Sequence, residues 1–193
     1  MKLRLSLLAF FTIASATLIM AQNHDKRMAQ IRQAYADRLE IMKNTPYEDR
    51  LFNEISVDVA QNLPGSGLYE RHDKYHFTQE QYSEDGKMCS QLYFVTSKET
   101  YAMGAHVYYW EFLWDSMERD PMFAYLVRQE GDSKKEYRFY FENDKVIKTM
   151  PEVKQWPLKD MMSLHPYVID SPADVLKIMK RHVEKFKSLL NEE

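Results

Sequence analysis

The chain has 193 residues, of which 45% are hydrophobic, 28% charged and 13% aromatic, and its formal net charge is −3. Acidic and basic residues are interspersed, so the clustered positive charge typical of nucleic-acid-binding proteins is missing and we expect no nucleic-acid partner. Cys89 is the only cysteine, which excludes an intramolecular disulfide bond. The fold must therefore be stabilised by burial of apolar side chains.

The first 21 residues have the pattern of a cleavable export signal, with a short positive start and an apolar run over residues 5–14. Cleavage could follow Ala16 or Ala21, and we favour Ala21 because the polar chain begins at Gln22. The apolar run is too short and too often interrupted by Ser and Thr for a membrane span. We expect a periplasmic or secreted protein with no membrane span after signal removal.

The mature chain, residues 22–193, is expected to form a single α+β domain. Loss of Lys2 and Arg4 with the signal lowers the basic residues from 26 to 24 against 29 acidic ones, a net charge of −5. The 172 residues that remain of 193 are enough to bury a hydrophobic core.

Two stretches have the period of an amphipathic helix. Apolar residues recur at three- and four-residue steps from Met28 to Met42, and Asn44-Thr45-Pro46 ends the pattern because the residue before a proline disfavours helix. Near the C-terminus, Ser171 is a typical N-cap and Pro172 a typical first helical residue. They begin a second helix, whose apolar stripe runs from Val175 to Leu190.

Between these helices the period changes to two, which is typical of strands. The predicted strands are Ile55–Val59, Tyr69–Phe77, Met88–Thr96, His106–Trp114, Met122–Arg128, Glu136–Glu142 and Lys145–Thr149, the last two joined by a tight turn at Asn143-Asp144. Short connections allow antiparallel neighbours and leave no room for crossover helices. We therefore predict a mostly antiparallel meander sheet of six to seven strands packed on helix, with one helix before it and one after. The proline-containing region 150–171 is predicted to be an ordered loop.

The segment HVYYWEFLWD, residues 106–115, has five aromatic rings in ten residues. Alternation along a strand places four of them on one face, namely Tyr108, Trp110, Phe112 and Trp114. We expect this face to form one core with a face of each of the next two strands. The first of these faces carries Phe123, Tyr125 and Val127, and the second carries Tyr137, Phe139 and Phe141. An exposed face of this kind would exceed the apolar patch that soluble monomers normally tolerate.

The opposite face is the predicted binding surface. Its candidate residues are Tyr109, Glu111, Arg128, Arg138 and Tyr140, to which the loop residue Trp156 is added. Tyr and Arg are common at recognition surfaces. The alternative is an ordinary solvated sheet face with cross-strand charge pairs.

No motif predicts catalysis, and we expect no metal ion and no cofactor. His72 and His76 could share a zinc ion on a helix, but on a strand they lie roughly 13 Å apart. Cys89 has no cysteine-protease signature around it. Glu111 and Asp115 could contribute to a carboxylate pair for glycoside hydrolysis, although acidic residues are too common for this to be specific.

Several segments resemble a family of small secreted proteins of unknown function from Gram-negative anaerobic bacteria. These are IMAQ, IRQAYADRLEIM, VAQNLPGSGLYERHDKYHF, YYWEFLWD and YRFYFENDKVIK. The resemblance implies secretion and carries no activity to any residue. The succession of helix and meander also resembles a cystatin-like arrangement, in which a curved sheet wraps a helix, although fold does not imply function.

The leading functional hypothesis is a non-catalytic binding or interaction module of the periplasm or cell exterior. Its partner would be a glycan, a peptide or an envelope protein. A hydrolase acting on glycans or peptides, using Glu111 or the histidines near His72, is one alternative. A structural accessory subunit of an exported complex is another.

Overall fold

The computed structural model describes residues 24–46, 52–64, 67–81, 88–101, 106–115, 120–152, 169 and 171–190. The chain divides into two compact units, residues 1–44 and 45–193. The predicted export signal and Trp156 lie outside the described residues. Within the described residues, no helix is long and apolar enough to cross a membrane.

The described part of the first unit is one helix, residues 24–44. Its polar side chains are mostly exposed, and Gln33 donates a hydrogen bond to Asp37 one turn later, at 2.6 Å. The helix stops before Pro46, as predicted, because the residue that precedes a proline is pushed out of the helical region.

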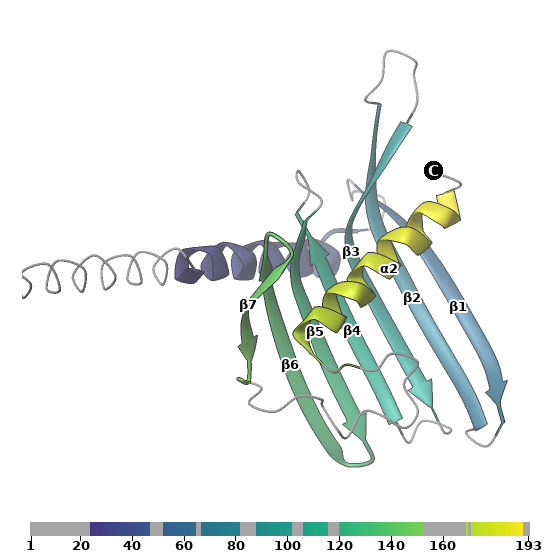
Figure 1. Ribbon diagram of the computed structural model, residues 1–193. Helices are drawn as coiled ribbons and strands as arrows, with labels where there is room; N and C mark the ends of the chain where they lie inside the picture. Colours follow the sequence, from purple (N-terminus) through teal and green to yellow (C-terminus); the bar gives the residue numbers. More distant parts are fainter. Residues whose placement is uncertain are drawn as a thin grey trace, which may run out of the picture. The chain divides into compact units, whose positions relative to one another are not determined.

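The second unit is built on a seven-stranded antiparallel sheet in which each strand lies beside its sequence neighbours (Figure 1). The strands are β1 (Asn53–Leu63), β2 (Gly67–Gln81), β3 (Met88–Tyr101), β4 (His106–Trp114), β5 (Pro121–Glu130), β6 (Ser133–Glu142) and β7 (Lys145–Met150). The predicted antiparallel meander is confirmed. Asn143 and Asp144 both have positive φ, 50° and 58°, as a two-residue turn between β6 and β7 requires.

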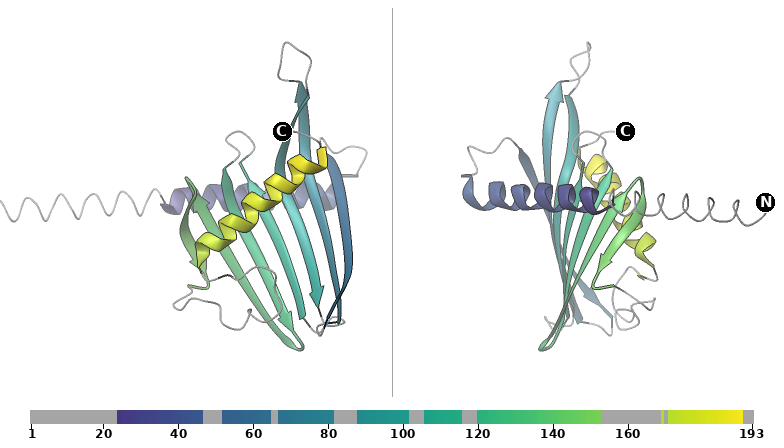
Figure 2. Two further views of the ribbon diagram at one scale, coloured as in Figure 1. Left: turned by 45° about the vertical axis from the view of Figure 1, so that its right-hand side comes forward. Right: turned by 90° about the vertical axis from the view of Figure 1, so that its left-hand side faces the viewer.

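The C-terminal helix α2 (Pro172–Leu190) runs obliquely across one face of the sheet (Figures 1 and 2). Ser171 lies directly before the first helical residue, as predicted for the cap position. Its hydroxyl and backbone N–H both donate to Asp174 Oδ2 at 2.9 Å, so Asp174 reaches back to the start of the helix as the acidic residue of a capping box does. We call the sheet face under this helix the α2 face, and the other the opposite face.

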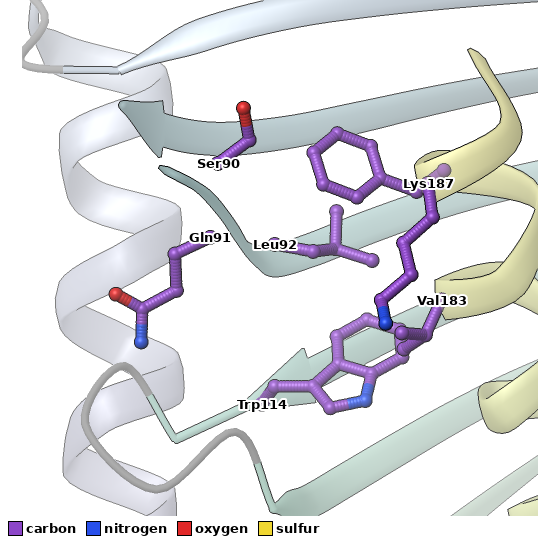
Figure 3. Close-up of a pocket in the computed structure, with 7 residues that line it drawn as sticks. Ser90, Gln91, Leu92, Trp114, Val183 and Lys187 are labelled. Carbon is purple, nitrogen blue, oxygen red and sulfur yellow. The ribbon is translucent and has the colours of Figure 1, made fainter. Parts of the chain in front are cut away.

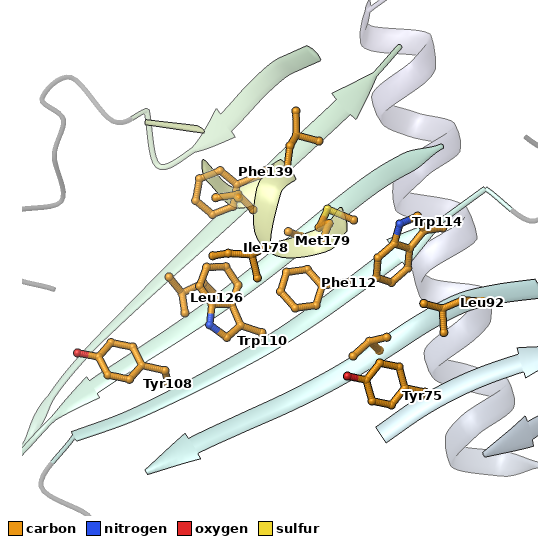
Figure 4. Close-up of a cluster of buried hydrophobic side chains, with 14 of the residues drawn as sticks. Tyr75, Leu92, Tyr108, Trp110, Phe112, Trp114, Leu126, Phe139, Ile178 and Met179 are labelled. Atoms are coloured by element: carbon orange, nitrogen blue, oxygen red, sulfur yellow. The ribbon is translucent and has the colours of Figure 1, made fainter. Parts of the chain in front are cut away.

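The core lies between α2 and the α2 face (Figure 4). The four predicted aromatic residues of β4 are buried there, and the ring of Trp110 stacks on that of Phe112 at 5.3 Å. Helix α2 contributes the buried residues Val175, Leu176, Ile178, Met179 and Phe186. Burial of each large apolar side chain is worth about 1.5–3 kcal/mol, so this layer is the main stabilising element of the unit.

One predicted part of this core is wrong. The register pairs Phe112 with Ala124 and Trp110 with Leu126, so β5 presents its smaller residues to the α2 face. Phe123 and Tyr125 therefore point to the opposite face. Residues 122–127 are apolar or aromatic at both odd and even positions, so the sequence pattern does not show which set faces α2. The large rings of β4 and β6 leave space between them only for the smaller side chains of β5.

Candidate functional site

Four side chains come together on the opposite face, three of them predicted. Glu111, Tyr125 and Arg138 form one cross-strand row over β4, β5 and β6, and Tyr109 lies beside Glu111 on β4. We call these four residues the Tyr125 patch. Three of its members were expected to share a surface, whereas Tyr125 had been assigned to the core.

Internal contacts hold the side chains of the Tyr125 patch in place. The hydroxyl of Tyr109 donates to Glu111 Oε1 at 2.7 Å, and the Arg138 guanidinium lies over the Tyr125 ring, 5.1 Å from its centroid. Arg138 also pairs with Glu136 at 3.4 Å, and its side chain is 42% exposed. Burial, with a hydrogen bond to Glu136, raises the pKa of Tyr125 to about 12. Both ring hydroxyls of the patch stay protonated at neutral pH, because burial also raises the pKa of Tyr109.

The remaining predicted site residues are not part of this patch. Arg128 pairs across the sheet with Tyr108, so it lies on the α2 face, is only 3% exposed, and forms an ion pair with Glu130. The prediction that Arg128 lies on the opposite face is therefore wrong. As for the rest of β5, the even-numbered residues face α2 and the odd-numbered residues face away from it. Tyr140 is on the opposite face, but it is 3% exposed and its ring packs on Phe123 at 5.2 Å.

On β1 and β2, the exposed part of the opposite face carries the charge pairs of an ordinary solvated sheet, whereas His76, Phe94 and Leu113 on the same face are buried. Asp58 pairs with His72 at 2.7 Å between β1 and β2, and Glu54 pairs with Lys74 at 3.0 Å. Exposed pairs of this kind contribute about 0–1 kcal/mol each. They give β1 and β2 a polar surface without the aromatic groups found on β4 and β5.

The two histidines of the possible zinc pair lie on strand β2, as predicted. His72 pairs with the exposed Asp58, whereas His76 is buried, with its ring 5.5 Å from that of Phe52. Among the described residues, no group of three His, Cys, Asp or Glu side chains is placed to hold a metal ion. The lateral neighbours of Glu111 are Thr96 and Tyr125, so the register puts no second carboxylate beside it for hydrolysis.

The α2 face contains a buried polar cluster that the sequence analysis missed. Asp73 has a fully buried side chain, and Ser97 Oγ donates to its Oδ1 at 2.6 Å. Lys185 Nζ lies 2.7 Å and Arg71 Nε 3.2 Å from its Oδ2. Burial raises the pKa of Asp73, but the hydrogen bonds from Lys185 and Ser97 outweigh it, so the net shift is downward. Asp73 is therefore a carboxylate that connects β2, β3 and α2.

His182 on α2 extends this cluster. Its Nδ1 lies 3.1 Å from the hydroxyl of Tyr75, and its ring is 5.0 Å from that of Phe112. Burial lowers the pKa of His182 to about 4, so the imidazole is neutral at neutral pH. A second buried carboxylate, Glu99, accepts hydrogen bonds from Tyr69 at 3.2 Å and Tyr101 at 2.8 Å. His182 therefore joins α2 to the sheet, whereas Glu99 joins β2 to β3.

A pocket lies beside this cluster, between the C-terminal half of α2 and strands β3 and β4 (Figure 3). Its apolar walls are Leu92, Trp114, Val183 and Phe186, and its polar residues are Ser90, Gln91 and Lys187. Its cavity volume is about 50 Å³, and it is partly open to solvent. This volume corresponds to a few water molecules, so the pocket would take only a small group.

In the described part of the chain, a function could rest on the Tyr125 patch, on the buried cluster around Asp73 or on this pocket. No protein-family model, curated protein or solved structure matches this chain.

Proposed function

We propose that the protein is an exported, non-catalytic binding module that recognises a peptide segment of an envelope protein through the Tyr125 patch. The single observation that carries this proposal is the position of Arg138 over the ring of Tyr125, on a sheet face beside the hydrogen-bonded pair Tyr109–Glu111. Tyrosine and arginine are the residue types that most often dominate binding energy at protein interfaces.

The fixed geometry of the patch supports this role. The contacts of Tyr109 with Glu111, and of Arg138 with Tyr125 and Glu136, already restrict these long side chains before a partner arrives. Ordering a free side chain at an interface costs about 0.5–1.5 kcal/mol, and a restrained side chain loses less. The patch therefore presents aromatic surface and charge at a low entropic cost.

The chemistry of the patch favours a peptide over a small metabolite. Small ligands are generally bound in concave sites, whereas this patch follows neighbouring strands across the face of a sheet. Arg138 would meet a carboxylate or a backbone carbonyl, and the tyrosine rings would contact apolar side chains. Glu111 has Thr96 and Tyr125 as lateral neighbours, an arrangement that favours recognition over paired-carboxylate hydrolysis.

A thermal-shift screen of the exported protein against envelope-protein peptides and a panel of glycans tests the proposal. A ligand that binds only the folded state stabilises it by about 2.7 kcal/mol when its concentration is one hundred times its Kd. This stabilisation raises the melting temperature. We expect a peptide to raise it, and the double variant Tyr125→Ala/Arg138→Ala to abolish the rise.

The matched control is Asp58→Ala/His72→Ala, which removes another ion pair from the same face. This control should respond to the peptide like the unmodified protein. The proposal fails if no peptide raises the melting temperature, or if both double variants lose the response equally. A response to glycans alone would likewise overturn recognition of a peptide, and it would indicate a glycan as the partner.

A further inference from the structure

The pocket between α2 and strands β3 and β4 has an apolar interior. Leu92, Trp114 and Phe186 are each less than a tenth exposed, and Val183 packs against the same core. A group that enters this pocket therefore meets hydrocarbon and aromatic surface on several sides. The pocket is on the α2 face, so it is separate from the Tyr125 patch.

Among the described residues that line the pocket, Lys187 is the one that carries a charge, and its position differs from that of the other lysines of α2. Lys177, Lys180 and Lys185 each lie 2.6–2.7 Å from an aspartate, namely Asp174, Asp144 and Asp73. No described acidic residue lines the pocket or pairs with Lys187. The positive charge at this pocket is therefore not neutralised by the described part of the chain.

A second donor lies in the same place. Trp114 contacts Phe112 through its ring, and its indole N–H has no acceptor among the described residues. Figure 3 shows the amine of Lys187 directed toward the indole of Trp114. An ammonium group and an indole N–H are both donors and have no acceptor capacity, so together they favour an anionic acceptor.

We propose that this pocket binds a small monocarboxylate with a compact apolar body, such as a short branched aliphatic acid. The apolar body would contact Leu92, Val183 and Phe186, and the carboxylate would accept hydrogen bonds from Lys187 and Trp114. The limited space excludes long or highly branched ligands. This site goes beyond the proposed recognition of a peptide and does not depend on it.

Nuclear magnetic resonance titration of the exported protein tests this site, because the chain has only three tryptophans and therefore at most three indole N–H signals. The probes are isobutyrate, its neutral counterpart isobutanol, and acetate, which has a carboxylate but almost no apolar body. After triple-resonance assignment, we expect isobutyrate to shift the Trp114 indole signal saturably. Isobutanol should bind at least about tenfold more weakly, since a charge-assisted hydrogen bond is worth a factor of this order. Acetate should also bind about tenfold more weakly, because it lacks two carbons that are each worth about 0.8 kcal/mol on burial.

Two variants of matched charge complete the test. Lys187→Gln should weaken isobutyrate binding about tenfold or more, whereas Lys180→Gln, which removes the same charge from the same helix outside the pocket, should leave it unchanged. The proposal is overturned if isobutyrate leaves the Trp114 signal in place, if isobutanol or acetate binds as tightly as isobutyrate, or if the two variants bind isobutyrate equally. Both lysines are exposed, so neither substitution threatens the fold.

Discussion

Replacing Asp73 with Asn should destabilise the protein far more than the same change at Asp58. Asn is nearly the same size as Asp, and its carbonyl can still accept the hydrogen bond from Ser97. The substitution removes the charge that balances Lys185 and Arg71, and it replaces their acceptor Oδ2 with an amide NH₂ group, which can only donate. Breaking a buried pair by removing one partner costs about 3–5 kcal/mol.

We expect the low end of this range for Asp73→Asn, about 3 kcal/mol, because water can still reach Lys185 and Arg71, whose side chains are 29% and 20% exposed. For a protein of this size, that loss corresponds to a fall in melting temperature of about 6–12 °C. Asp58→Asn should cost less than about 1 kcal/mol, because Asp58 and its partner His72 have side chains that are 73% and 54% exposed.

Urea unfolding followed by tryptophan fluorescence measures both variants. The midpoint should move strongly for Asp73→Asn and little for Asp58→Asn, with the slope unchanged in each case, so that the shift reports stability alone. A loss below about 1 kcal/mol for Asp73→Asn would refute the reasoning, since it would mean that the buried carboxylate is not needed to hold α2 on the sheet.

Three further predictions concern the core, pH and the helix start. Trp110→Ala should cost about 3–5 kcal/mol of stability, since it removes a buried ring. Glu111→Ala removes the hydrogen bond with Tyr109 and should cost about 1 kcal/mol. Equal losses of the two variants in urea unfolding would contradict the assignment of these residues to opposite faces of β4. The pKa of His182 is about 4 when folded, against 6.5 for a free histidine, so the unfolded chain takes up the proton first and stability should fall as pH drops from 6.5 to 4. His182→Gln should make the dependence of unfolding free energy on pH shallower in that window, and an unchanged slope would show that the histidine does not contribute. Ser171→Ala should cost about 1 kcal/mol through loss of the cap on α2, and a loss near zero would show that Asp174 alone is sufficient there.

The secondary structure and its order could be predicted from the sequence because they depend on local periods. All seven strands and both helices lie where the alternation and the helical spacing indicate, and Asn143-Asp144 forms the predicted turn. Turn length then makes neighbouring strands antiparallel, which is sufficient for the meander topology.

Strand parity could not be predicted for β5. Residues 122–127 are apolar or aromatic throughout, so alternation is compatible with either face toward α2. A shift of one residue exchanges every side chain between faces, which moved Phe123 and Tyr125 out of the core and Arg128 into the α2 face. Only the packing of rings from neighbouring strands selects one parity.

The buried polar cluster was missed because its members are far apart in sequence. Asp73 and Lys185 are separated by 112 positions and meet only when α2 lies on the sheet. One local feature could have indicated it. Arg71 and Asp73 have the same parity on the strand as Tyr69, Tyr75 and Phe77, so two charged residues lie on a strand face that is otherwise aromatic. Charged residues within such a face usually have a buried partner elsewhere in the chain.

Site-specific photo-crosslinking in the producing cell tests the central claim, recognition of an envelope protein by the Tyr125 patch, most directly. A benzophenone amino acid replaces Tyr125 in one variant and His72, on the same sheet face, in the other. The account predicts a discrete protein adduct from position 125 that is absent from position 72. No adduct at position 125, or the same adduct from both positions, would contradict it.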